Sequence, residues 1–169
     1  MDDYFDRLGL PRRFSVDPGE LERAYLARSR AVHPDYHVAG ATADLAVSLD
    51  AAAAVNEAYN TLKDPFARAE YLLSLEGGPA AGEHTALPAG FLAEMLEARE
   101  EIEAARGDAG RAAELEAGYA ARYDRLLAEV AAAFQAHAAR PDRAALVTVR
   151  ERLNAAKYVR RLLDDLHAG

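Results

Sequence analysis

Amphipathic helical patterns fill most of this chain, and short segments rich in glycine and proline separate them. Valine, isoleucine and threonine do not cluster in the alternating runs that indicate β-strands. Apolar residues recur instead at intervals of three and four, as they do on one face of a helix. The sequence therefore predicts an all-α protein, and its breaks divide the chain into two parts.

The first part begins with two helices whose ends are marked by local signals. A short helix over residues 3–8 ends at Gly9. Asp17 is the predicted N-cap of the second helix. This helix ends near Val32, because Pro34 removes a backbone donor and clashes with the preceding turn. Its predicted inward stripe is Leu21, Tyr25, Arg28 and Val32.

Two further helices complete the first part. The third covers residues 42–62 and forms a hairpin with the second, and the fourth begins at Phe66 and ends at the glycines 77 and 78. A glycine or proline just beyond the last residue of a helical apolar pattern indicates the end of the helix. The inward stripe predicted for the third helix is Leu45, Leu49, Ala52, Asn56 and Tyr59.

The second part follows a segment rich in glycine, proline and alanine, residues 77–90. This composition is typical of a linker. Short connections between long helices favour an antiparallel bundle, so we expect three helices packed in this way. They cover residues 88–106, 109–139 and 141–167, and the domain boundaries are 1–76, 77–87 for the linker and 88–169.

Charge and composition narrow the classes of function. The formal net charge is −8, so we expect neither a nucleic-acid partner nor an anionic membrane surface. There are no cysteines, which excludes disulfides, zinc–thiolate sites and thiolate catalysis. No apolar run is long enough to span a membrane, and the acidic start does not resemble a secretory signal. We expect a cytoplasmic protein.

The loop between the second and third helices carries His33, Pro34, Asp35 and His37. His33, Asp35 and His37 could converge on a metal ion, although a fourth ligand would have to come from elsewhere. A catalytic site would need a nucleophile or a paired carboxylate, and none lies nearby. An ordinary helix C-terminus also favours a histidine, because its dipole end is negative. The residues alone leave these alternatives open.

A helical hairpin whose loop reads His-Pro-Asp (HPD) resembles the J-domain of DnaJ-type co-chaperones. The segments "DYFDRLGLP", "NEAYNTLKDPFARAEYLLSL" and "FLAEMLEAREEIE" extend the resemblance to the HscB family, the J-domain co-chaperones of iron–sulfur cluster assembly. The resemblance covers nearly the whole chain. It implies a J-domain over residues 1–76, a three-helix bundle over 88–169 and an L-shaped molecule.

The resemblance implies that His33, Pro34 and Asp35 engage a DnaK/HscA-type chaperone and stimulate its ATPase, so this chain is not itself an enzyme. Arg23 and Arg30 would add a basic face. Two departures concern this surface. Leu26 and Ala27 stand where general J-domains often carry bases, and Tyr36 follows HPD where lysine is usual.

The resemblance also implies a client, an IscU-type scaffold protein bound by the first helix of the bundle. Phe91, Met95, Ala98 and Ile102 form the core stripe of this helix, and Leu92 and Leu96 lie about 100° further round. The residues alone favour two leucines that widen the buried face, whereas the resemblance makes them client contacts. The client-binding residues that it implies are Leu92, Leu96, Glu97, Glu100 and, on the last helix, Tyr158.

Two other functions stay open at this stage. One is a J-domain adaptor for a different client. The other is a metal-dependent enzyme that uses His33, Asp35 and His37. The favoured interpretation involves no cofactor and no resident metal.

Overall fold

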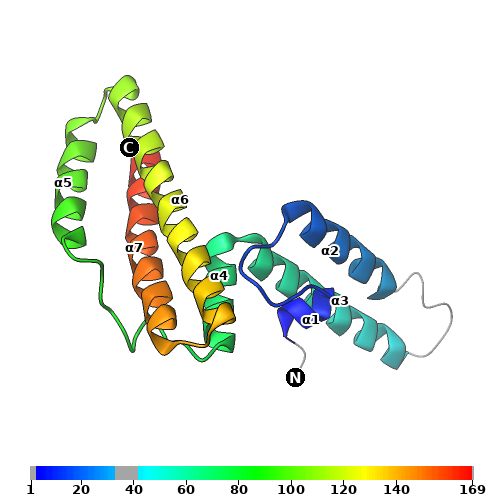
Figure 1. The fold of residues 1–169 in the computed structure, drawn as a ribbon. Helices are drawn as coiled ribbons and strands as arrows, with labels where there is room; N and C mark the ends of the chain where they lie inside the picture. The colour runs from blue at the N-terminus through cyan, green and yellow to red at the C-terminus, as the bar shows by residue number, and fades with distance from the viewer. Residues whose placement is uncertain (1–2, 33–41, 169) are drawn as a thin grey trace. The chain divides into compact units, whose positions relative to one another are not determined.

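The computed structural model describes residues 3–32 and 42–168, with the side chains of all these residues except 42–46. Within these ranges the chain forms seven α-helices and no β-strand (Figure 1), so the predicted all-α fold is confirmed. One compact unit ends at Leu72 and a second begins at Leu73. The helices are α1 Tyr4–Leu8, α2 Pro18–Val32, α3 Thr42–Lys63, α4 Pro65–Leu75, α5 Phe91–Ala104, α6 Ala109–Ala139 and α7 Arg143–Ala168.

The first helices of the N-terminal unit are fixed by their caps. The side chain of Asp3 accepts the backbone N–H of Asp6 at 2.9 Å and so caps α1. Gly9 ends α1 in the left-handed region, at φ 72°, where glycine carries no steric cost. Asp17 accepts the N–H of Glu20 at 2.8 Å, as predicted for the cap of α2.

Helices α2 and α3 form the predicted hairpin. The ring of Tyr25 stacks on that of Tyr59 with centroids 4.2 Å apart, and its hydroxyl donates to Oδ1 of Asn56 at 2.8 Å. At the C-terminal end of α2, the hydroxyl of Ser48 donates to the carbonyl of Val32. These contacts fix the register of α2 against α3 and direct Leu21 into the core, where it is 3% exposed.

The inward face predicted for α3 was wrong by about one residue. Leu49 is 55% exposed, and Asn56 is also exposed. The helix contains a run of alanines, whose small side chains distinguish neighbouring faces poorly. The polar and aromatic positions Asn56 and Tyr59 lie on the flank that meets α2. Among the described side chains of α3, the buried ones are Ser48, Val55, Ala58 and Leu62.

A buried arginine joins α3 to α4. Arg68 is 8% exposed, and its Nη1 donates to the carbonyl of Leu62 at 2.9 Å, at the end of α3. Its guanidinium also lies 5.2 Å from the ring centroid of Phe14. Burial lowers the pKa of Arg68, with the Asp64 carboxylate opposing this effect. The arginine thus satisfies a helix-end carbonyl and covers an aromatic ring at once.

The C-terminal unit is an antiparallel bundle of α5, α6 and α7, as predicted. Contacts that advance along α5 move backwards along α6: Glu94 pairs with Arg122, whereas Glu101 lies 3.7 Å from Arg111. The same reversal relates α6 to α7, where the ion pairs are Glu129 with Arg152 and Glu116 with His167. The three helices lie side by side in Figure 1.

The segment expected to be a linker is packed on α7. The side-chain amide of Asn154 donates to the backbone carbonyls of both His84 and Ala86, at 3.0 Å each. Nε2 of His84 lies 3.0 Å from Oε1 of Glu151, and Pro79 is buried. We call residues 79–88 the strap. Its contacts make it part of the C-terminal unit.

None of the helices formed by the described residues combines the length and the apolar character needed to cross a bilayer.

Candidate functional site

The HPD loop lies outside the described residues, together with Tyr36 and His37. The structure places its two flanks: α2 ends at Val32 and α3 begins at Thr42. Among the residues that the structure does describe, no group of three or more histidine, aspartate or glutamate side chains could hold a metal ion. The predicted roles of His33, Pro34 and Asp35 stay predictions.

The outer face of α2 carries both predicted basic residues. Arg23 and Arg30 are exposed, and within the described ranges neither makes an ion pair. Leu26 lies between them along the helix and is 44% exposed. Arg28, expected on the inward stripe, is also exposed, and its guanidinium lies beside Gly9, where Nη2 is 3.0 Å from the place a Cβ would occupy.

Helix α5 separates an inner face from an outer one. Phe91, Met95 and Ala98 are 2%, 6% and 4% exposed, which makes them the core stripe that the spacing predicts. Leu92 and Leu96 are 59% and 65% exposed. The leucine pair therefore does not widen the core.

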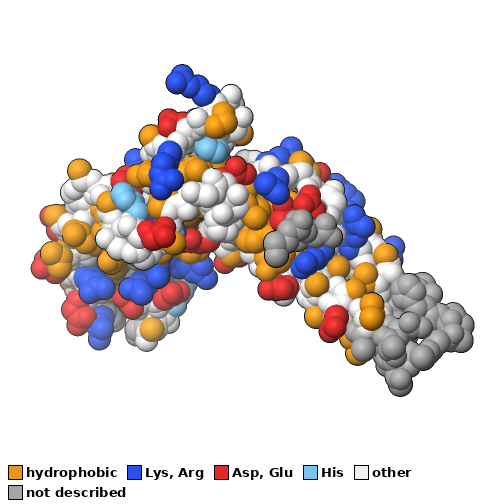
Figure 2. Space-filling model, turned by 90° about the horizontal axis from the view of Figure 1, so that it is seen from below, with side chains coloured by type: hydrophobic (Ala, Val, Ile, Leu, Met, Phe, Trp, Pro, Cys, Tyr) orange, Lys and Arg blue, Asp and Glu red, His pale blue; other side chains and the backbone are white. Residues whose placement is uncertain are grey.

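Acidic residues border the leucine pair, and they differ in whether they form ion pairs with α6. Glu94 and Glu101 face α6, where they pair with Arg122 and Arg111. Glu97 and Glu100 are exposed, and no ion pair to either is found within the described part of the chain. In the view of Figure 2, acidic and basic side chains intermingle on the surface and do not form one large patch of a single sign.

Tyr158 reaches α5 from α7. Its ring meets that of Phe91 edge to face, with centroids 6.2 Å apart, and its side chain is 37% exposed. The guanidinium of Arg122 lies 5.1 Å from the same Phe91 ring. Phe91 directly precedes Leu92, so Tyr158 is brought to the end of α5 that carries the leucine pair. We call Leu92, Leu96, Glu97, Glu100 and Tyr158 the α5 surface.

The contacts that pack α5 against α6 were not predicted from the sequence. Tyr119 donates from its hydroxyl to the carbonyl of Ala98 at 3.3 Å, and burial, reinforced by Glu101, raises the pKa of this phenol. The buried tyrosine and the paired arginines hold the backbone of α5 in place. The only sequence signal for this contact was the complementary charge of facing helices.

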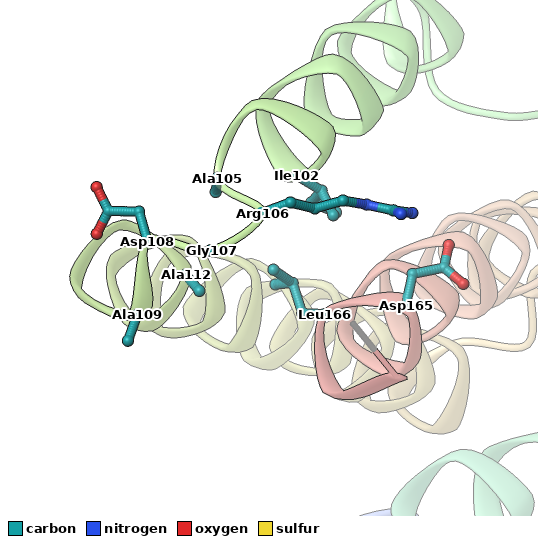
Figure 3. Close-up of a pocket in the computed structure, with 9 residues that line it drawn as sticks. All are labelled: Ile102, Ala105, Arg106, Gly107, Asp108, Ala109, Ala112, Asp165 and Leu166. Carbon is teal, nitrogen blue, oxygen red and sulfur yellow. The ribbon is translucent and has the colours of Figure 1, made fainter.

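A pocket of about 300 Å³ lies at the other end of α5, where the chain turns into α6. In Figure 3 the side chains of Ile102 and Leu166 point toward one another across it. The charged groups in its lining are Arg106, Asp108 and Asp165, and no serine, cysteine or histidine contributes. The pocket thus lacks the nucleophile–base pair of a hydrolytic site.

Comparison with protein families gives two matches that together span most of the chain. The model of the DnaJ domain matches residues 3–71, and the model described as the HSCB C-terminal oligomerisation domain matches residues 87–167.

Curated relatives carry the description co-chaperone protein HscB homolog. One from Chromobacterium violaceum is 46% identical over 107 residues, which are 63% of this chain and 61% of that protein. One from Bordetella petrii is 41% identical over 117 residues, 69% of each chain. The alignment with the first relative thus spans less than two thirds of its length.

Solved structures agree with this assignment. The chaperone HscB from Vibrio cholerae superimposes with a TM-score of 0.81 at 27% identity, covering 99% of this chain and 96% of that one. Human co-chaperone protein HscB gives a TM-score of 0.84 at 26% identity, covering 99% and 82%. This chain belongs to the HscB family of J-domain co-chaperones.

Proposed function

We propose that this co-chaperone binds an IscU-type iron–sulfur scaffold protein through the α5 surface, delivers it to a DnaK/HscA-type chaperone and stimulates that chaperone's ATPase through the HPD loop. The J-domain over residues 1–76 would stimulate the ATPase, and the bundle over 88–169 would bind the client. The observation that carries the proposal is the exposure of Leu92 and Leu96, at 59% and 65%, on a helix whose opposite face is buried.

The α5 surface has the composition of a protein-binding site. Two leucines one turn apart offer an apolar centre, and Glu97 and Glu100 offer a polar rim that is not engaged within the described part of this chain. Interfaces commonly combine a desolvated apolar centre with a rim of this kind. Tyr158 supports the proposal as a large side chain with a polar tip, a type enriched at interfaces.

The HPD loop would act on the chaperone without any chemistry of its own. Pro34 restricts the loop, which lowers the conformational entropy lost on binding. Asp35 can accept a charge-assisted hydrogen bond from a basic group of the chaperone, and His33 would help to place it. The hydrolytic groups belong to the ATPase.

Single-turnover ATP hydrolysis by the purified chaperone tests the proposal, with this protein and a purified IscU-type scaffold added alone and together. We expect synergy between the two, abolished by His33→Gln. The Leu92→Ser, Leu96→Ser double variant should keep its folded circular dichroism spectrum and lose the synergy.

Other outcomes select the alternatives. Stimulation that does not respond to scaffold would leave a J-domain adaptor for a different client. Absence of stimulation, together with one equivalent of bound metal after purification, would favour the metal site at His33, Asp35 and His37.

A further inference from the structure

A second pocket of the C-terminal unit, of about 400 Å³, gathers arginines around an apolar floor. Residues of α5, α6 and α7 line it. The floor is formed by Phe91 and Leu126, which are 2% and 7% exposed. We call this cavity the arginine pocket, and its lining shares no residue with the α5 surface. The charged residues of its lining are Glu94, Arg122, Arg125, Glu129 and Arg152.

These five charged groups leave one positive charge without a partner. Arg122 forms an ion pair with Glu94. Arg152 forms one with Glu129. Arg125 is exposed and makes neither an ion pair nor a hydrogen bond to the described residues. It lies one turn from Arg122 on the same side of α6, where like charges repel each other. The pocket thus keeps an uncompensated positive charge on a chain whose net charge is −8.

The two paired arginines also keep donors for a ligand. A guanidinium group has five N–H donors. Nη2 of Arg122 donates to Glu94, and this arginine makes no other hydrogen bond to the described residues. Nε of Arg152 donates to Glu129 in the same way. A phosphate monoester suits three such groups, because it offers three strong acceptor oxygens and up to two negative charges, whereas a carboxylate offers two oxygens and one charge.

We propose that the arginine pocket binds a small molecule that carries a phosphate monoester next to an aromatic or other apolar group. The phosphate would contact Arg122, Arg125 and Arg152. The apolar group would lie against Phe91 and Leu126. The size of the pocket identifies the ligand as a small molecule, because pockets for such ligands have volumes of about 300–1,000 Å³. This site goes beyond the proposed function, which concerns protein partners alone.

Isothermal titration calorimetry of the full chain with phenyl phosphate tests the proposal. We expect one equivalent to bind. Its affinity should exceed that of inorganic phosphate, which lacks the apolar group, and that of benzoate, which lacks the phosphate. Arg125→Ala should raise the dissociation constant of phenyl phosphate by about tenfold, because it removes a charge-assisted hydrogen bond. Arg125 is exposed, so this variant should keep its folded circular dichroism spectrum.

Arg161→Ala is the matched control, because Arg161 is an exposed arginine of α7 that does not line the pocket. An equal loss of affinity in this variant would overturn the proposal, since the effect would then come from net charge alone. Equal binding of inorganic phosphate or of benzoate would overturn the assigned class of ligand. If phenyl phosphate does not bind, the site itself is refuted.

The pocket and the α5 surface can be tested separately. The Leu92→Ser, Leu96→Ser double variant should bind phenyl phosphate as the wild type does, because neither leucine lines the pocket. Loss of phosphate binding in this variant would contradict a separate site. Conversely, Arg125→Ala should keep the scaffold synergy, so failure of the proposed function leaves this inference open to its own test.

Discussion

Asp3 combines a helix cap with an ion pair at the start of the chain. Its carboxylate accepts the N–H of Asp6 and receives Nε of Arg12 at 2.9 Å. Burial by itself would raise the pKa of Asp3, but the hydrogen bonds from Asp6 and Arg12 outweigh it and hold that pKa below its usual value. The carboxylate is therefore more stable ionised in the folded chain than in the unfolded one.

This shift gives Asp3 a pH-dependent share of stability. Because the folded pKa is depressed, the stabilisation is present above the unfolded pKa of about 3.9 and is lost as pH falls through the folded value. We expect Asp3→Ala to lower the free energy of unfolding of the N-terminal unit by about 1–2 kcal/mol at neutral pH. The difference from wild type should shrink in acid. Urea unfolding, followed through the backbone amide signals of α1, measures both.

Asp17→Ala is the control for this prediction. Asp17 also caps a helix, through the N–H of Glu20, but it is exposed. If Asp17→Ala and Asp3→Ala show the same pH dependence, the ion pair between the buried Asp3 and the exposed Arg12 contributes nothing specific.

Some single residues could be predicted from sequence and others could not. Gly9 and Asp17 act through neighbours within a few positions, so local pattern is enough to assign their roles. Arg68 acts on Leu62 and on Phe14, which come from separate segments. An arginine in an amphipathic pattern is expected at the surface, and only the tertiary fold explains why this one is buried.

Helix ends were predicted better than helix faces. The breaks at Gly9 and Pro34 depend on backbone chemistry, and α1 and α2 end close to them, at Leu8 and Val32. Which face of a helix is buried depends on the helices that pack against it. On α7 the spacing predicts a core stripe of Val149, Leu153, Ala156 and Leu163. The first three are fully buried, but Leu162 is buried in place of Leu163. Toward its C-terminus α7 buries a different side, where Val159 and Leu162 lie in the core.

The strap is the element whose behaviour the sequence predicted least well. Its glycine, proline and alanine content is typical of a flexible linker, yet Asn154 holds two of its carbonyls. We expect Asn154→Ala to lower the free energy of unfolding by about 1 kcal/mol and to speed amide exchange and proteolysis within residues 79–88. Hydrogen–deuterium exchange with peptide resolution measures the local effect.

Lys157→Ala is the matched control for the strap, because Lys157 is an exposed residue one turn further along α7. Unchanged exchange in the strap of the Asn154→Ala variant would contradict the role of this side chain. It would assign the attachment to the His84–Glu151 pair and to the buried Pro79.

The two proposed binding sites belong to different compact units: the HPD loop is part of the first and the α5 surface is part of the second. One chain can therefore carry a chaperone-binding site and a client-binding site. The sequence predicted two helical parts, separated by the segment rich in glycine, proline and alanine. The exposure of Leu92 and Leu96 was not decided by periodicity, since two leucines beside a core stripe satisfy either a wider core or an open surface. Family resemblance favoured the open surface, and the packing of α5 through Phe91 and Met95 leaves the leucines exposed.

If a single chain must bind client and chaperone at the same time, a chain defective in one site cannot be rescued by a second chain defective in the other. We expect a mixture of full-length His33→Gln with the full-length Leu92→Ser, Leu96→Ser variant to show no scaffold synergy in ATP hydrolysis. The first would hold scaffold without triggering, and the second would trigger without scaffold, so the local concentration of client at the chaperone is not raised. Each variant at the total concentration of the mixture is the control. Synergy restored by mixing would show instead that the two sites work across separate chains, and a single-chain bridge would then be the wrong description.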